Sequence, residues 1–278
     1  MSETQPLNLA GVIGYPIAHS KSPRLHGHWL AHHGIQGHYI PMSVAPEDLQ
    51  DTLRLLPKLG FRGINVTIPH KERVLALSDS ATEAALKIGA ANTLSFESDG
   101  RVRADNTDAY GFLENIKKHA PMVNLNEKTA LCLGAGGASR AVLYALTKAG
   151  ISRILLANRT QARADALAEL FTNKVEVLRW GTALNQRQDV DMIVNSTSLG
   201  MTGQSDLPFS KGIFGSDMVV NDLVYTPLRT SFLTEAKNAG ATTVDGLGML
   251  LHQAKPGFQK WFGTVPTIDE DLRKTVIE

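Results

Sequence analysis

The sequence predicts an α/β fold with two domains, and three observations support this prediction. The chain has 278 residues, and at about 150 residues per domain that length suits two domains of modest size. In the second part of the chain, short apolar segments alternate with amphipathic helical segments, which indicates parallel strands joined by helices. A glycine-rich turn at residues 134–139 separates one predicted strand from the next helix. Such a turn is typical of nucleotide-binding sheets.

The composition argues against several classes of protein. The 28 basic and 27 acidic side chains give a net charge of +1, which is unusual for a general nucleic-acid or membrane-surface binder. No apolar run reaches the roughly 18 residues that a membrane-spanning helix needs, and Glu3 stands where a signal peptide would carry positive charge. The single cysteine, Cys132, allows no intramolecular disulfide and fits a reducing compartment. We therefore expect a soluble, cytoplasmic protein.

The first part of the chain predicts a mixed domain of strands and helices. An apolar strand leads into a loop rich in Gly, Pro and Ser, and Gly34 stops the helix that follows. Pro69 ends a later strand, and a turn at residues 98–100 joins two short strands as a hairpin. The predicted strands are residues 9–14, 38–44, 63–68, 92–97 and 101–104, and the predicted helices are residues 24–33, 46–59 and 82–87.

The second part predicts a parallel sheet covered by helices on both faces, because strands and helices alternate regularly. The predicted strands are residues 129–133, 154–157, 174–178, 192–195, 218–222 and 242–244. The predicted helices are residues 109–119, 139–149, 162–171, 231–239 and 248–262. We expect a first domain of residues 1–107, to which residues 246–278 return with the C-terminal helix, and a second domain of residues 108–245.

The glycine-rich turn predicts a Rossmann-like dinucleotide site in the second domain. Gly134 suits the tight turn after a strand, and Gly136 lets the backbone approach a pyrophosphate at the N-terminus of the next helix. Ser139 is small enough for close packing of helix on strand. A glycine-rich turn without a ligand is the alternative. The candidate cofactor-binding residues of this turn are Gly134, Ala135, Gly136, Gly137 and Ala138.

The end of the following strand favours NADP over NAD. An NAD site places Asp or Glu about 20 residues after the glycines, where it binds the ribose hydroxyl. This chain has Asn158, Arg159 and Thr160 at that place, and Arg163 one turn into the helix. Two guanidinium groups and a hydroxyl suit a 2′-phosphate, which an acidic side chain would repel.

Short polar motifs of the first domain lie at strand ends and in loops. Ser20 and Ser22 precede a helix, where hydroxyls and nearby N–H groups can hold a carboxylate. Asn65 and Thr67 share one face of a strand, and Lys71 lies just beyond its end. Further polar motifs are residues 92–93 and 105–108. Capping, turns or a solvated lysine explain each motif alone, but the set together indicates a site.

Nine short motifs link the chain to a known family. They are residues 14–26 (GYPIAHSKSPRLH), 65–71 (NVTIPHK), 89–93 (GAANT), 106–112 (NTDAYGF), 134–141 (GAGGASRA), 158–160 (NRT), 195–201 (NSTSLGM), 222–227 (DLVYTP) and 246–253 (GLGMLLHQ). In this order they resemble shikimate dehydrogenases over essentially the whole chain, which is far more specific than a dinucleotide-binding turn alone. The chain departs from the family at Gly27, where Asn is usual.

The resemblance implies a substrate site between two domains. Ser20 and Ser22 match carboxylate-binding serines, and Lys71 matches the catalytic lysine with Asp108 as its partner. The residues that match contacts to ring hydroxyls are Thr67, Asn92, Asp108, Tyr225 and Gln253. The residues that match NADP contacts are the glycine turn, Asn158, Arg159, Thr160 and Arg163, with Leu223, Gly246 and Met249 at the nicotinamide end and Glu83 as a further candidate.

The activity that the resemblance implies is the NADPH-dependent, reversible reduction of 3-dehydroshikimate to shikimate, a step toward chorismate and the aromatic amino acids. Lys71 can donate a proton to the oxygen that becomes an alkoxide, and its charge can stabilise that oxygen. Asp108 can orient the lysine and a neighbouring hydroxyl. Two alternatives stay open, a quinate/shikimate dehydrogenase that uses NAD and a non-catalytic metabolite-sensing homologue. We expect a small-molecule substrate, no nucleic-acid or membrane partner, and a monomer or homodimer.

Six of the nine histidines fall within residues 19–38, a stretch without Asp or Glu. His28 and His32 stand four residues apart on one predicted helix face, which is the spacing of paired metal ligands. Zinc sites usually recruit Cys or a carboxylate as well, and the stretch offers neither. We therefore expect no metal and interpret these histidines as helix surface and packing. Cys132 lies on a predicted strand and is expected to be a buried, inert thiol.

Overall fold

A computed structural model describes residues 8–171, 174–185 and 189–278. The chain divides into two compact units, unit 1 (Met1–Thr107 and Gln253–Glu278) and unit 2 (Asp108–His252). The chain returns to unit 1 at Gln253, inside a helix, whereas the sequence suggested residue 246. In the described ranges, no helix is long and apolar enough to cross a membrane.

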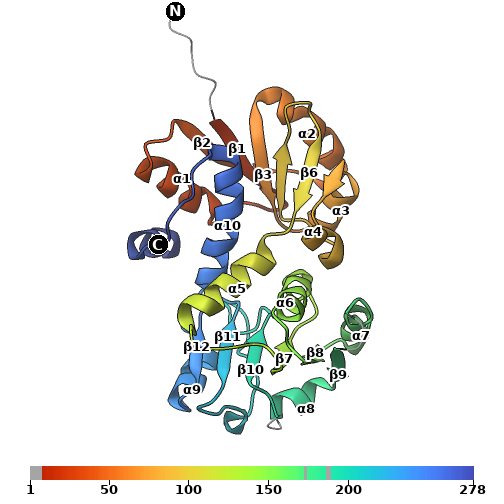
Figure 1. The fold of residues 1–278 in the computed structure, drawn as a ribbon, viewed down its shortest axis with the longest axis vertical. Helices are drawn as coiled ribbons and strands as arrows, with labels where there is room; N and C mark the ends of the chain where they lie inside the picture. The colour runs from red at the N-terminus through yellow and green to blue at the C-terminus, as the bar shows by residue number, and fades with distance from the viewer. Residues whose placement is uncertain (1–7, 172–173, 186–188) are drawn as a thin grey trace, which may run out of the picture. The chain divides into compact units, whose positions relative to one another are not determined.

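Unit 1 contains a six-stranded mixed sheet with the strand order β2-β1-β3-β5-β6-β4 (Figure 1). Its strands are β1 (Asn8–Gly14), β2 (Gly37–Ser43), β3 (Phe61–Val66), β4 (Ser80–Ala81), β5 (Thr93–Phe96) and β6 (Val102–Asp105). β1 pairs in parallel with β2 and β3, whereas β5 is antiparallel to both β3 and β6. The predicted hairpin of β5 and β6 is therefore confirmed.

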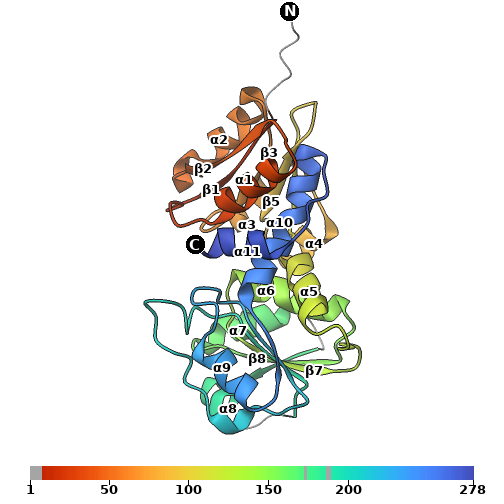
Figure 2. The same cartoon turned by 90° about the vertical axis from the view of Figure 1, so that its left-hand side faces the viewer.

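Helices cover both faces of this sheet. On one face, α2 (Leu49–Leu55), α3 (Lys71–Ala76) and α4 (Glu83–Ile88) enclose an apolar core with the strands. On the other face lie α1 (Ser22–His32) and the later part of α10 (Gly246–Phe262). The C-terminal helix α11 (Glu270–Ile277) packs on α1 (Figure 2).

An aromatic cluster fills the space between α1, α10 and the sheet. The rings of Trp29 and Phe258 pack edge to face, with 5.2 Å between their centroids. The buried imidazole of His26 stacks on the ring of Tyr39 at 3.9 Å. Burial lowers the pKa of His26 to about 3, so this histidine is neutral. The interpretation of the histidines as packing groups is confirmed for His26.

Unit 2 contains a six-stranded parallel sheet with the order β12-β11-β10-β7-β8-β9 (Figure 1). Its strands are β7 (Thr129–Leu133), β8 (Arg153–Ala157), β9 (Val175–Leu178), β10 (Met192–Asn195), β11 (Val219–Asp222) and β12 (Thr242–Val244). Counted from β9, the order is third, second, first, fourth, fifth and sixth, which is that of Rossmann folds. The predicted Rossmann-like domain is confirmed.

The helices of unit 2 lie on both faces of its sheet, as the alternation of strands and helices predicted. One face carries α5 (Asp108–His119), α6 (Gly137–Lys148) and α7 (Gln161–Glu169) (Figure 1). The other carries α8 (Trp180–Asn185) and α9 (Ser231–Asn238), which share a core with the strands.

The structure corrects one predicted helix and adds elements that the sequence pattern did not indicate. Residues 46–59 are not one helix, because two short 3₁₀ turns, Pro46–Asp48 and Pro57–Leu59, flank α2. Pro57 has no N–H to continue the helix. The elements not predicted are β4, α3, α8 and α11. The first three have at most six residues, too few to show a periodic pattern.

Trp261→Ala is expected to destabilise the protein strongly. The Trp261 side chain is 0% exposed and its Nε1 donates to the carbonyl oxygen of Leu94 at 3.1 Å. Removing the ring leaves a cavity and removes a buried hydrogen bond, so the free energy of unfolding should fall by about 3–5 kcal/mol in urea titrations. Leu86→Ala in the same unit, where the side chain is 64% exposed, should change it by less than about 0.5 kcal/mol. Equal effects of the two substitutions would contradict this account of the core.

Candidate active site

The strand register of unit 1 brings four polar segments to one edge of its sheet. β1 and β3 run in parallel and end together, with Ile13 opposite Val66. β5 begins and β6 ends at the same edge, since Thr93 lies opposite both Asn65 and Asp105. The segments that leave this edge are residues 15–22, 67–71, 91–92 and 106–107. Polar side chains beyond the carboxyl ends of parallel strands are the usual ligand-binding arrangement in α/β sheets.

Ser20 and Ser22 stand at the N-terminus of α1. The backbone N–H of Ser22 donates to the Oγ of Ser20 at 3.3 Å, and α1 begins at Ser22 with Pro23 in its first turn. The first turn contains no acidic residue. Two hydroxyls beside the positive end of a helix dipole suit a carboxylate.

Lys71 is the first residue of α3, so its backbone is part of a helix and not of an irregular loop. The N–H of Ala91 donates to the carbonyl oxygen of Lys71 at 2.8 Å, which ties α3 to the segment before Asn92. The N–H of His70 donates to Thr67 O at 3.0 Å, and the buried ring of His70 bonds through Nε2 to Val44 O at 2.8 Å. These bonds place Lys71 and Thr67 next to each other at the sheet edge.

The side-chain amide of Asn92 joins the polar segments of this edge. Its Oδ1 accepts hydrogen bonds from the N–H of Thr107 at 2.9 Å and from the hydroxyl of Thr107 at 3.1 Å. A backbone N–H can only donate, so this bond fixes Oδ1 as the acceptor and Nδ2 as the donor. Asn92 Nδ2 donates to Gln253 Oε1 at 3.1 Å, which turns the Nε2 donor of Gln253 to the other side.

A second layer of buried polar groups supports Asn92. Tyr39 Oη donates to Asn65 Oδ1 at 2.7 Å, and Asn65 Nδ2 donates to Asn92 O at 3.2 Å and to Thr93 Oγ1 at 3.1 Å. Burial raises the pKa of Tyr39 well above its usual value, so the phenol stays a donor. The sequence named Thr93 only as part of the polar motif at residues 92–93 and did not name Tyr39. Only the strand register shows that both face Asn65.

The glycine turn of unit 2 follows β7 and leads into α6, as predicted. Gly134 has a φ of +109°, a conformation that side chains disfavour, and its N–H donates to Ala157 O at 2.8 Å. Gly136 has an ordinary backbone conformation, and a Cβ built there would meet no atom within 4 Å. Glycine at this position therefore keeps open space above the helix N-terminus, which fits a pyrophosphate.

The NRT motif lies at the carboxyl end of β8, beside the glycine turn. Asn158 bridges the two segments, because its Oδ1 accepts from Ala135 N at 3.2 Å and its Nδ2 donates to Thr160 O at 2.8 Å. Thr160 precedes the first residue of α7, and the side chains of Arg159 and Arg163 are both exposed beside this helix start. Open space at the glycine turn and two exposed guanidinium groups fit the phosphates of NADP.

A buried polar network holds the two loops that follow β10 and β11. Asn195 Nδ2 and Val224 N donate to Asp222 Oδ1 at 2.9 and 3.0 Å, and Thr230 Oγ1 donates to Asp222 Oδ2 at 2.6 Å. Burial raises the pKa of Asp222 to about 6, although these three hydrogen bonds lower it. Asn195 Oδ1 in turn accepts from the hydroxyl of Thr197 at 2.7 Å.

Asn195 and Asp222 were not named as site residues from the sequence. The available signal was a short polar residue at the carboxyl end of an apolar strand, which both residues share. Asp222 precedes the candidates Leu223 and Tyr225, and it fixes the start of their loop. A side chain at Gly246, the first residue of α10, would collide with Leu223 O, so glycine lets α10 approach this loop.

The remaining candidates are divided between the units. Asp108, the buried first residue of α5, belongs to unit 2, as do Tyr225 and the buried Met249. Glu83 is exposed on α4 of unit 1, whereas the other cofactor candidates belong to unit 2. Cys132 is fully buried in β7, and burial raises the pKa of its thiol to about 12. The predicted inert thiol is confirmed.

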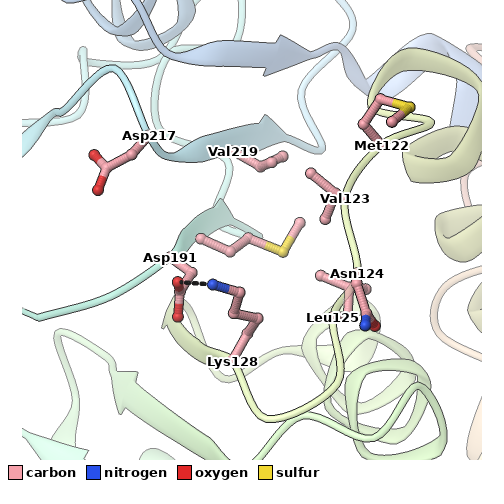
Figure 3. A pocket seen from close by; sticks show the side chains of 9 residues that line it. Met122, Val123, Asn124, Leu125, Lys128, Asp191, Asp217 and Val219 are labelled. Carbon is pink, nitrogen blue, oxygen red and sulfur yellow. Dashed lines mark hydrogen bonds and ion pairs between the residues drawn. The ribbon is translucent and has the colours of Figure 1, made fainter.

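Unit 2 also has a cavity of about 300 Å³ away from these residues. It lies at the amino ends of β7, β10 and β11, opposite the glycine turn, and Figure 3 shows Lys128 paired with Asp191 at its wall. Its lining residues are Met122, Val123, Asn124, Leu125, Lys128, Asp191, Met192, Asp217 and Val219. None of these residues belongs to the motifs described above, so the cavity has no part in the site.

Comparison with known proteins gives one consistent result along the chain. Residues 12–94 match the family described as the shikimate dehydrogenase substrate binding domain, and residues 114–201 match the family described as shikimate / quinate 5-dehydrogenase. The chain is 54% identical to a shikimate dehydrogenase (NADP(+)) of Cereibacter sphaeroides over 277 residues, which cover 100% of this chain and 99% of that protein.

Solved structures share the fold along nearly the whole chain. Shikimate 5-dehydrogenase from Thermus thermophilus, in complex with NADP(H) and shikimate, has a TM-score of 0.85 and 37% identity, covering 98% of this chain and 99% of that one. Quinate dehydrogenase from Corynebacterium glutamicum, in complex with NAD, has a TM-score of 0.88 and 30% identity, with coverages of 98% and 99%.

The raised pKa of Asp222 predicts a pH-dependent stability. An aspartate in the unfolded chain has a pKa of about 3.9, so folding favours the protonated form of this residue. Its contribution to stability is present below about pH 4 and is lost as the pH rises through about 6. Relative to Asp222→Asn, which cannot titrate, the wild-type free energy of unfolding should fall by about 2 kcal/mol from about pH 4 to pH 7.

Urea titrations of wild type and Asp222→Asn at several pH values measure this difference directly. Since both proteins share every other titrating group, the slope of the difference isolates residue 222. A difference that stays flat or rises with pH would refute the raised pKa.

Proposed function

The chain belongs to the shikimate dehydrogenase family, and from this membership we propose how its residues catalyse the NADP-dependent interconversion of 3-dehydroshikimate and shikimate. The observation that carries the proposal is the edge of unit 1 where Lys71 and Thr67 lie beside the Asn92 network. The match of residues 12–94 to a substrate binding domain supports this edge as the substrate site, and hydrogen bonds fix its polar groups. As an NADP-dependent dehydrogenase the protein is an oxidoreductase.

Substrate recognition in this proposal uses a charge contact and hydroxyl contacts. Ser20 and Ser22, at the N-terminus of α1, bind the carboxylate. The side chains proposed to bind the ring hydroxyls are Thr67, Asn92 and Gln253 of unit 1, with Asp108 and Tyr225 of unit 2. The fixed orientation of the Asn92 and Gln253 amides supports a selective role, because each amide offers a defined donor or acceptor.

Lys71 is proposed to manage the charge and the proton at the reacting oxygen. NADP, when bound, supplies or accepts the hydride. In the direction of reduction, the Lys71 ammonium donates a proton to the oxygen that becomes the alkoxide of the new hydroxyl group. Asp108 accepts a hydrogen bond from the lysine or from a neighbouring hydroxyl and orients it. In the reverse direction the neutral amine of Lys71 takes that proton back.

The cofactor is proposed to be held by three groups of residues in unit 2. The turn at the N-terminus of α6 would hold the pyrophosphate; its residues are Gly134, Ala135, Gly136, Gly137 and Ala138. Arg159, Thr160 and Arg163 bind the 2′-phosphate, with Asn158 fixing the turn. Leu223, Gly246 and Met249 are assigned to the nicotinamide end, and Glu83 is a further candidate.

Two rival functions are disfavoured by the residues present. A quinate dehydrogenase that uses NAD shares this fold, but the exposed Arg159 and Arg163 suit a 2′-phosphate and leave no acidic partner for a ribose hydroxyl. A non-catalytic metabolite sensor does not need Lys71 and Asp108, and both are present. We also propose a cytoplasmic location, supported by the single buried cysteine. A monomer or homodimer stays a prediction.

Substitution of Lys71 tests the catalytic assignment. Lys71→Ala should lower turnover by about 100-fold or more, while the dissociation constant of NADPH, measured by fluorescence titration, stays nearly unchanged. Lys71→Arg keeps the charge but cannot exchange a proton near neutral pH. Recovery of activity by arginine would indicate electrostatic stabilisation, and no recovery would indicate proton transfer. Lys87→Ala, an exposed lysine on α4, serves as the control, and turnover of Lys71→Ala at the control level would disprove the role.

Substitution of the two arginines tests the cofactor assignment. Arg159→Ala and Arg163→Ala should each lower the preference for NADP over NAD in kcat/KM by about 10- to 100-fold, because each removes a charged hydrogen bond to the 2′-phosphate. Activity with NAD should change little. Arg153→Ala is the matched control, because Arg153 begins β8 and Arg159 follows the opposite end of that strand. If a variant with both substitutions kept the wild-type preference for NADP over NAD, this phosphate site would be ruled out.

A further inference from the structure

The outer face of α1 carries two histidines in a metal-ligand spacing. His28 and His32 lie one helical turn apart, with 6.1 Å between ring centroids and 10° between ring planes. Parallel imidazoles at positions i and i+4 can direct one nitrogen each toward a shared ion. The sequence argued against a metal because no carboxylate or cysteine stands near these histidines.

The fold supplies the carboxylate that this stretch lacks. Asp269, immediately before α11, approaches the two histidines because α11 packs on α1 (Figure 2). One ring nitrogen of His28, one ring nitrogen of His32 and one carboxylate oxygen of Asp269 all lie within 4.8 Å of one another. The expectation of no metal rested on the absence of a carboxylate near these histidines in the sequence. The packing of α11 on α1 brings the carboxylate of Asp269 there.

Hydrogen bonds from other residues of unit 1 to backbone oxygens at both ends of α11 help to hold this arrangement together. The buried Trp29, next to His28, donates from Nε1 to Thr267 O at 2.8 Å, two residues before Asp269. At the other end of α11, Lys21 Nζ donates to Ile277 O at 3.4 Å. Leu272 and Val276 of α11 are buried, so this helix is also held by apolar packing. The fold therefore brings the three residues within reach of one another before any ion binds.

Hydrogen bonds also orient two of the three groups. The hydroxyl of Thr275 donates its one hydrogen to Asp271 O at 2.9 Å, so we assign His28 Nδ1 as the donor in its 3.4 Å contact with this hydroxyl. Nδ1 then carries the proton, and the Nε2 lone pair of His28 is available to a metal, an arrangement common around metal-bound histidine. Asp269 Oδ1 accepts from Leu272 N at 2.8 Å as the helix cap, which leaves Oδ2 for a cation.

We propose that His28, His32 and Asp269 form a binding site for a divalent transition-metal ion such as Zn²⁺, with water in the remaining position. Two imidazole nitrogens and one carboxylate oxygen suit zinc, cobalt or nickel, and nitrogen ligands disfavour Mg²⁺ and Ca²⁺. Zinc bonds of about 2.0–2.2 Å need ligand atoms roughly 3.3 Å apart. The exposed side chains of His32 and Asp269 can rotate to reach that spacing.

The bound ion would fasten the C-terminal helix to α1, the helix whose N-terminus carries Ser22. The site uses none of the residues assigned to substrate or cofactor. It is therefore independent of the proposed dehydrogenase activity and is tested without measuring that activity.

The test is equilibrium dialysis of the full chain, free of any affinity tag and pretreated with a chelator, against Zn²⁺ alone. Wild type should bind one Zn²⁺ per chain at this site, and His28→Gln, His32→Gln and Asp269→Asn should each weaken its binding at least 10-fold. Asn keeps the cap on α11, because its side-chain oxygen also accepts from Leu272 N, so loss in this variant cannot come from unfolding of the helix. Thr275→Val should weaken binding about 10-fold or more through His28.

Two control variants remove similar groups outside the site. His38→Gln replaces an exposed histidine on β2, and Glu270→Gln replaces the exposed acid next to Asp269. Both should bind Zn²⁺ as wild type does. Zn²⁺ should also raise the Tm of wild type, because it binds the folded chain, and both controls should show the same rise. The proposal is overturned if wild type binds no stoichiometric Zn²⁺, or if the three ligand variants bind it as tightly as the two controls.

Discussion

The side-chain amide of Asn92 is the interaction on which the proposed substrate edge of unit 1 depends. Its oxygen takes two hydrogen bonds from Thr107, and its nitrogen donates to Gln253, so it connects the end of β6, the start of β5 and α10. The neighbouring Ala91 N–H holds Lys71 at the start of α3. Because these hydrogen bonds fix the donor and acceptor sides of the Asn92 amide, this side chain is oriented before a substrate arrives.

Unit 2 uses the same principle with a different polar group. The carboxyl of Asp222 collects hydrogen bonds from Asn195, Val224 and Thr230, and so ties the ends of β10 and β11 to their loops. Burial makes its charge costly, as the raised pKa shows. A buried carboxyl with three donors suits a network that fixes loops.

The sequence predicted the architecture well where periodicity and strand ends carried the information. The glycine turn, the hairpin of β5 and β6 and the six strands of unit 2 follow from such patterns. Tyr39 escaped prediction, and the bond of Thr93 to Asn65 was not foreseen, because both depend on which strands are neighbours and in what register. Asp269 escaped because α11, an unpredicted helix, carries it to histidines at the other end of the chain. Contacts between distant segments have no signal in a local pattern.

The measurement that tests the central claim most directly is a comparison of four substrate and cofactor pairs. The purified protein is assayed for oxidation of shikimate and of quinate, each with NADP and with NAD, by following absorbance of the reduced nicotinamide. The account predicts that shikimate with NADP gives the highest kcat/KM, because Arg159 and Arg163 bind the 2′-phosphate and the Lys71 edge binds the substrate ring. Quinate with NAD as the best pair, or no oxidation with any pair, would contradict it.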